Sequence, residues 1–308
     1  MPDNISQLLA PPVVPIEQLS SPLYQQAEVD VRLLRLDRVD QGISGNKWYK
    51  LQHNLLDAHR RGVHRIISFG GAWSNHIHAL ACAGNRFGFE TIGIIRGESE
   101  YANNPTLSDA RTWGMRLEFV TRAEYRRRSD EAYHQELLAR WPGSVIVPEG
   151  GSNALALDGV AGLVRQIEQQ DCQPDYLITA CGTGGTLAGL VAAAPRHWRV
   201  LGVAALKGAG FLYRDVQALL EAAKVCPQAY WGIDLEGHEG GYARTSGALV
   251  QFISRFEQQH QIPLEHVYTA KMLFRLEQLI ERGAFCPGSR ILALHTGGLQ
   301  GRRGLLEG

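Results

Sequence analysis

From about residue 31 onward, the chain alternates short apolar runs with amphipathic stretches, and Gly, Asn, Ser or Pro stands at most of the joints. Most of the apolar runs are β-branched and apolar on both faces, as the strands of a buried parallel sheet are. We predict strands at 31–36, 65–69, 91–96, 116–120, 144–148, 175–180, 199–206 and 290–294.

Helix signals lie between these strands. Asn104 followed by Pro105 is a capping residue before a proline at the first helical position, and Thr121 with Glu124 has the spacing of a capping box. Gly62 closes the amphipathic stretch 48–61. Strands that alternate with helices predict a doubly wound α/β protein whose ligand lies beyond the carboxyl ends of the strands.

Length and composition narrow the class of protein. The 308 residues suffice for two domains, and 44% hydrophobic with 20% charged residues is ordinary for a soluble protein. No apolar run approaches the length of a membrane span, and the 31 basic and 31 acidic residues balance. We therefore expect neither a nucleic-acid partner nor a membrane partner. The N-terminal stretch lacks the pattern of a secretory signal, which favours the cytoplasm.

Cysteine usage agrees with a reducing compartment. Five cysteines lie far apart without CxxC spacing, so neither a disulfide framework nor a zinc site is predicted: Cys82, Cys172, Cys181, Cys226 and Cys286.

Lys47 lies in the segment SGNKWYK, directly after a Gly-Asn turn at the start of a predicted helix. The positive end of the helix and burial would both lower the pKa of its amine and favour the neutral form that makes an imine. Judged alone, the segment also fits a surface lysine beside a turn.

A second segment, FGGAWSNHIHALACAG, is a strand end followed by a helix start. Ser74 and Asn75 are good capping residues, and the unpaired N–H groups behind them form a site for a carboxylate or phosphate. Capping alone would also explain them. His76 and His78 diverge on a helix, so we predict no metal site.

A third segment, DYLITACGTGGTLAGL, runs from an apolar strand through a glycine-rich turn into a helix of small residues. The turn comprises Gly182, Thr183, Gly184, Gly185 and Thr186. Its backbone N–H groups and hydroxyls favour a phosphate, although a purely structural turn is the alternative. It matches neither a P-loop nor a dinucleotide fingerprint. Near the C-terminus, RILALHTGGLQG repeats this design and presents Thr296 at a strand end.

Together these segments resemble fold-type II enzymes that depend on pyridoxal 5'-phosphate (PLP), and among them the family of 1-aminocyclopropane-1-carboxylate (ACC) deaminases and D-cysteine desulfhydrases. The likeness extends from about residue 30 to the end. It implies two doubly wound α/β domains with mostly parallel sheets: a large PLP-binding domain of 1–52 with 153–308, and a small domain of 53–152.

The resemblance also implies roles for individual residues. Lys47 would be the Schiff-base lysine, and Asn75 would bond the ring oxygen of the cofactor. Ser74, Asn75 and the backbone at His76 would receive the substrate carboxylate. The turn at 182–186 would hold the phosphate, with its closest match at 183–186.

Two tyrosines that face the substrate in the family fall on Tyr242 and Tyr268, although a loop tyrosine and a core aromatic are the alternative interpretations. ACC deaminases carry an acidic residue after the second tyrosine, whereas this chain has Thr269. The D-cysteine desulfhydrases resemble this chain better at that position. Thr296 would then contact the pyridine nitrogen of the cofactor. Trp48 and Tyr49 also depart from the family, and we expect them near the mouth of the active site.

These features predict a PLP-dependent lyase or deaminase for a small amino acid. The preferred reaction is elimination from D-cysteine to give a 2-oxo acid, ammonia and sulfide, with Lys47 as the base. ACC deamination is the alternative reaction. A phosphate-binding module, or a PLP-binding protein without catalysis, is the non-enzyme alternative. A homodimer is implied by the resemblance alone.

Overall fold

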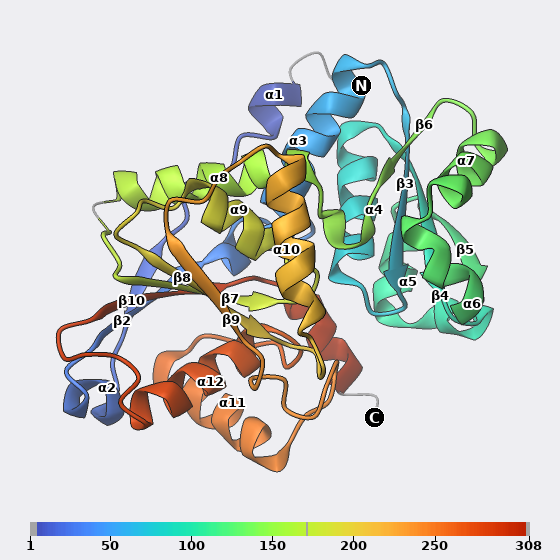
Figure 1. Ribbon diagram of the computed structural model, residues 1–308. Coiled ribbons are helices and arrows are strands. Elements are labelled where there is room, and N and C mark those ends of the chain that lie inside the picture. The colour runs from blue at the N-terminus through green and yellow to red at the C-terminus, as the bar shows by residue number, and fades with distance from the viewer. Residues whose placement is uncertain (1–4, 171, 306–308) are drawn as a thin grey trace.

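The computed structural model describes residues 5–170 and 172–305 and contains two sheets (Figure 1). The larger sheet has the strand order β1-β2-β10-β7-β8-β9, and the smaller has the order β5-β4-β3-β6. The strands are β1 Ile16–Leu19, β2 Asp30–Arg35, β3 Arg65–Gly71, β4 Glu90–Arg96, β5 Arg116–Val120, β6 Ser144–Val147, β7 Tyr176–Cys181, β8 Arg199–Ala204, β9 Tyr230–Asp234 and β10 Arg290–His295.

Helices cover both sheets. They are α1 Ile5–Leu8, α2 Pro22–Gln26, α3 Asn46–Arg60, α4 Asn75–Phe87, α5 Pro105–Thr112, α6 Arg122–Tyr125, α7 Glu131–Arg140, α8 Ala154–Gln169, α9 Gly185–Ala193, α10 Phe211–Ala222, α11 Gly247–His260 and α12 Thr269–Glu281. Short 3₁₀ turns include η4 Glu149–Gly151 and η5 Leu299–Leu305.

The α/β fold with mostly parallel sheets is confirmed. The eight predicted strands all form. Within residues 5–170 and 172–305, β1 and β2 are the only neighbouring strands that pair antiparallel. The sequence analysis missed β1 and β9, which lie at the two edges of the larger sheet. An edge strand is short and partly solvated, so its residues lack the continuous apolar run of a buried strand.

The centre of the larger sheet is buried on both faces. Along β10, Leu292 and Leu294 join the core on one face, whereas Ile291 and Ala293 join the core on the other. Helices α8, α9 and α10 cover the first face, and α11 and α12 cover the second (Figure 1). This two-sided burial explains why positions 291–294 are all apolar.

Two predicted helix starts are confirmed by their caps. Asn104 Oδ1 accepts a hydrogen bond from Leu107 N at 2.9 Å, and Thr121 Oγ1 accepts one from Glu124 N at 3.2 Å. The carboxylate of Glu124 accepts the hydroxyl of Tyr133 at 2.8 Å. In the predicted capping box, therefore, Thr121 caps the helix, whereas Glu124 bonds Tyr133 instead of the backbone of Thr121.

We propose the two-domain division given above, with boundaries at 52 and 153. It is supported by the strands, because 65–147 supplies the smaller sheet whereas 16–35 and 176–295 supply the larger. The largest hydrophobic cluster nevertheless contains residues from the helices of both sheets. The two units therefore share this cluster, and each also has a smaller hydrophobic cluster of its own.

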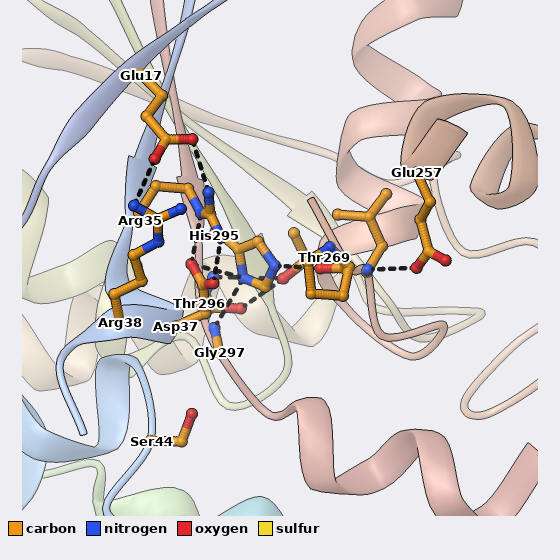
Figure 2. Close-up of polar contacts among 12 residues, drawn as sticks. Glu17, Arg35, Asp37, Arg38, Ser44, Glu257, Thr269, His295, Thr296 and Gly297 are labelled. Atoms are coloured by element: carbon orange, nitrogen blue, oxygen red, sulfur yellow. Dashed lines mark hydrogen bonds and ion pairs between the residues drawn. The ribbon is translucent and has the colours of Figure 1, made fainter. Parts of the chain in front are cut away.

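A buried ion pair fixes the carboxyl end of β2. Arg35 donates to both carboxylate oxygens of Asp37, at 2.9 and 2.7 Å, and each side chain is 3% exposed. Arg35 also donates to Glu17 Oε2 at 2.6 Å, which ties β1 to the same point. Figure 2 shows this group beside His295, at the end of β10.

Breaking this pair should destabilise the protein strongly. We expect Asp37→Ala to lower the free energy of unfolding by roughly 3 kcal/mol, because it leaves a buried guanidinium with only one carboxylate partner. Urea unfolding would measure the change. The control Arg61→Ala removes an exposed pair with Asp57 and should cost less than about 1 kcal/mol. Equal losses in the two variants would contradict the prediction.

Candidate active site

The carboxyl ends of β3, β7 and β10 and the amino end of α3 converge on one region. Asn46, the first residue of α3, makes the connection. Its backbone N–H donates to the Thr296 carbonyl at 3.2 Å, and its Nδ2 donates to Thr186 Oγ1 at 2.7 Å. The segments with Lys47 and 182–186 therefore meet at the end of β10, and the segment with Asn75 reaches the same turn, because a Cβ on Gly298 would lie 2.4 Å from Asn75 Nδ2.

Gly45 permits this convergence. It has φ +68°, and a Cβ at this position would lie 1.9 Å from the Thr296 carbonyl oxygen. Only glycine can adopt that conformation at that separation. The start of α3 can thus pack directly against the end of β10.

Lys47 follows on the first turn of α3, as predicted. Its Nζ donates to Asn46 Oδ1 at 3.0 Å. Burial lowers the pKa of Lys47 to about 8, and the negative charge of Glu265 partly opposes that shift. A sizeable fraction of this amine is therefore neutral near physiological pH and available as a nucleophile.

The turn at 182–186 joins β7 to α9. Gly184 has φ +75°, and its neighbours Thr183 and Thr186 bond Ser152 and Asn46 respectively, at 2.6 and 2.7 Å. The first N–H groups of a helix have no acceptor within the helix. The amino end of α9 therefore presents N–H donors at the turn for which the sequence predicts a phosphate.

Lys50, to which the sequence analysis assigned no role, lies beside this turn. Its side chain is buried, and Nζ donates to Ser152 Oγ at 2.7 Å and to Thr183 Oγ1 at 3.4 Å. Burial, aided by the charge of Lys47, holds the pKa of Lys50 well below its usual range. Its three-residue spacing from Lys47, which puts both on one helical face, is the signal that would have identified it.

Ser74 and Asn75 start α4. Ser74 Oγ accepts from Ile77 N at 3.3 Å, so the hydroxyl is a cap, and the N–H groups of Asn75 and His76 lie in the first helical turn. The imidazole of His76 points elsewhere, since Nε2 bonds Ser68 Oγ at 2.8 Å in the core. Burial and two nearby lysines keep the pKa of His76 well below its usual range.

Thr269 and Thr296 bring two hydroxyls together. Their Oγ1 atoms lie 3.2 Å apart, and Thr296 N also donates to Thr269 Oγ1 at 3.3 Å (Figure 2). The buried carboxylate of Glu265, which the sequence analysis missed, accepts backbone N–H groups at Val267, Tyr268 and Thr269. An acidic residue four positions before the helix was its sequence signal.

Tyr242 and Tyr268 do meet, although their sequence positions are 26 apart. Their ring centroids lie 6.2 Å apart at 65°, an edge-to-face contact. A Cβ on Gly182 would lie 2.9 Å from the ring of Tyr268, which places this pair beside the anion loop. Burial raises the pKa of both tyrosines, so both hydroxyls stay protonated at neutral pH.

The prediction for Trp48 and Tyr49 was wrong. Trp48 Nε1 donates to the Leu9 carbonyl at 3.2 Å, and Tyr49 is fully buried against α8, where its hydroxyl lies 3.4 Å from Gln166 Oε1. Each residue of a helix turns the side chain by about 100°, so these two leave the face that carries Lys47 and Lys50. They support packing and do not line the mouth of the site.

Within the described residues, no group of three or more His, Cys, Asp or Glu side chains is placed to hold a metal ion. His78 instead bonds Asp109 at 3.1 Å. In the same ranges, no helix combines the length and the apolarity that a bilayer span requires.

Comparison with known proteins decides what kind of site this is. The family described as pyridoxal-phosphate dependent enzymes matches residues 10–297, a range that contains Lys47, the 182–186 loop and Thr296. The chain belongs to this family.

Several relatives share the whole fold. A Pyrococcus horikoshii protein named a putative ACC deaminase is 28% identical over 305 residues, covering 95% of this chain and 91% of the relative. The Arabidopsis thaliana bifunctional D-cysteine desulfhydrase/ACC deaminase is 27% identical over 290 residues, or 87% and 72% of the two chains. The crystal structure of an ACC deaminase homologue matches with a TM-score of 0.80 and 27% identity, over 98% and 96% of the chains. The fold is therefore that of a fold-type II PLP enzyme.

The residues of this PLP enzyme fit its cofactor. Burial keeps the pKa of Lys50 well below its usual range, and within the described residues no carboxylate lies in ion-pair distance of its Nζ. A buried charge requires a partner, and a phosphate at the adjacent turn would supply one. A Cβ on Gly185 would lie 2.9 Å from Lys50 Nζ, so the absence of a side chain keeps that space open.

The rate of PLP uptake should depend on pH through Lys47. Only the neutral amine forms the imine, so we expect the rate to fall about tenfold per pH unit below 8 and to level off above it. Stopped-flow absorbance of the apoprotein mixed with PLP between pH 6 and 10 would measure it. A rate that is flat from pH 6 to 8 would contradict the lowered pKa.

Lys50→Met should weaken PLP binding without removing the imine. Losing a charge-assisted contact with the phosphate should raise the Kd for PLP roughly tenfold to a hundredfold. Equilibrium titration by fluorescence would measure this Kd. Lys224→Met, at an exposed lysine, is the matched control and should bind as the unmodified protein does. If both variants bind equally well, Lys50 does not contact the phosphate.

Proposed function

We propose that this PLP enzyme is a lyase that eliminates the thiol of D-cysteine and yields a 2-oxo acid, ammonia and sulfide. One observation supports it above the others, namely the pair of neutral hydroxyls of Thr269 and Thr296, 3.2 Å apart. In our assignment, Thr296 contacts the pyridine nitrogen of the cofactor. A neutral partner leaves this nitrogen less protonated than an acid would, and so suits a good leaving group such as thiolate.

When bound, PLP supplies the electron sink that stabilises negative charge at the substrate Cα. The chain supplies the remaining functions. Lys47 would hold the cofactor, and its Nζ would remove the Cα proton of the substrate. The lowered pKa of Lys47 supports this role, because it allows the amine to accept and release a proton near neutral pH.

The amino ends of two helices bind the anionic groups in this proposal. The 182–186 loop and Lys50 hold the phosphate at α9. Ser74 and the N–H groups of Asn75 and His76 receive the substrate carboxylate at α4, and the Asn75 side chain bonds the ring oxygen. Holding both anions at fixed points orients the Cα–H bond toward Lys47.

Tyr242 and Tyr268 would act as hydrogen-bond donors to the substrate. Burial raises the pKa of each hydroxyl, which excludes them as bases at neutral pH.

ACC deamination is the second candidate reaction. It is favoured by relatives that carry that name and by the contact between the two tyrosines, which the family uses at the substrate. The position of Thr269, where the ACC deaminases carry an acid, argues against it. We also propose, from the resemblance alone, that the protein is a homodimer in the cytoplasm.

The deciding experiment assays the PLP-loaded protein with D-cysteine and, separately, with ACC. We expect sulfide, ammonia and 2-oxo acid from D-cysteine, at least about tenfold faster than 2-oxobutyrate from ACC. Lys47→Ala should abolish turnover and the visible absorbance of the imine. Faster turnover of ACC would replace the proposal with the second reaction, and activity in Lys47→Ala would refute the mechanism. A loaded protein that processes neither compound would leave only PLP binding.

A further inference from the structure

The segment after β10 contains a side chain that the proposed mechanism does not use. Gln300, in η5, reaches across to the first residue of α4, where its Nε2 donates to Asn75 Oδ1 at 2.9 Å. Gln300 and Asn75 lie 225 positions apart in the chain.

This bond determines how the Asn75 amide is oriented. An amide has an acceptor end and a donor end, and Gln300 engages the acceptor end. The donor end, Nδ2, lies against Gly298, where a Cβ would be only 2.4 Å away. Within residues 5–170 and 172–305, no acceptor for Asn75 Nδ2 is found. The amide therefore retains two N–H donors for a ligand.

Gln300 is itself held in place. The backbone carbonyl of Gln300 accepts a hydrogen bond from Arg303 Nε at 3.1 Å, and Arg303 pairs with Asp109 of α5 at 2.5 Å. Asp109 in turn bonds His78 of α4 at 3.1 Å. The bond between Gln300 and Asn75 is thus made between two elements that are also tied to each other elsewhere.

We propose that Gln300 is a positioning residue that turns the Asn75 amide so that its N–H group, rather than its carbonyl, faces the ring oxygen of PLP. The inference rests on the role proposed above for Asn75. The ring oxygen carries negative charge in the bound cofactor, so a donor there stabilises it and a carbonyl would repel it. Asn75 can supply that donor reliably only if its other end is fixed.

A polarity reversal tests the inference. Gln300→Glu keeps the shape of the side chain but replaces the donor with an acceptor, so Asn75 should turn its Nδ2 toward the carboxylate and its Oδ1 toward the cofactor. We expect a Kd for PLP at least tenfold higher. The pH midpoint of the visible absorbance of bound PLP should also rise, because the ring oxygen loses its donor and binds a proton more tightly.

Three further variants separate orientation from other effects. Gln41→Glu adds the same charge in the same 530 Å³ groove as Gln300 and should change neither quantity by more than about twofold. Gln300→Met removes the donor without reversing it and should give a smaller change of the same sign. Asn75→Ala removes the responding amide, so adding Gln300→Glu to it should change both quantities by less than twofold. Thermal unfolding of each variant shows that it is folded.

The outcomes are distinct. A normal Kd and a normal midpoint in Gln300→Glu would overturn the inference, as would an equal effect of Gln300→Glu with and without Asn75→Ala. If Gln300→Glu does not fold, no effect in Gln300→Met overturns it. If Asn75→Ala itself binds PLP normally with an unchanged midpoint, the proposed role of Asn75 fails and the inference fails with it, although Lys47 and the phosphate loop remain unaffected.

Discussion

The site depends on one close contact between backbones. Gly45 packs against the Thr296 carbonyl at a separation that no side chain would allow, and Asn46 then donates to that carbonyl. This contact joins the start of α3 to the end of β10. Every other relation in the site follows from it, because Lys47 and Lys50 project from α3 whereas the two threonine hydroxyls are fixed by β10 and α12.

Two lysine amines share this region, and their environments differ. Lys47 has Glu265 as a counter-charge and retains a pKa of about 8. Lys50 has only hydroxyl partners among the described residues, and its pKa falls much further. Burial of two like charges side by side is unfavourable in the protein alone. A bound phosphate would instead favour the charged form of Lys50. The site is therefore complete only when it holds an anion.

Much of the fold was readable from the sequence because its strands are buried on both faces. β7 and β10 are continuous apolar runs followed by glycine, and that pattern predicts both the strand and the position of the site. β1 and β9 lie at the edges, where partial exposure removes the pattern. The segments around Lys47, Asn75 and 182–186 could be recognised for a different reason, because their turns require glycine and capping residues.

Pairings between distant side chains were not readable. Gln300 acts through Asn75, which only the tertiary fold brings near, and nothing local distinguishes Gln300 from a surface residue. Trp48 was misassigned because its neighbour in sequence, Lys47, belongs to the site, although a helix directs adjacent side chains apart.

The position of β10 also bears on how the protein is made. This strand, Arg290–His295, lies between β2 and β7 and pairs with both. The β1-β2 hairpin therefore has no neighbour in the sheet until some 250 further residues have left the ribosome. Such pairing across long sequence separations slows folding and exposes strand edges meanwhile. During synthesis, the apolar residues of β2 therefore wait for their sheet partner β10 until the chain is almost complete.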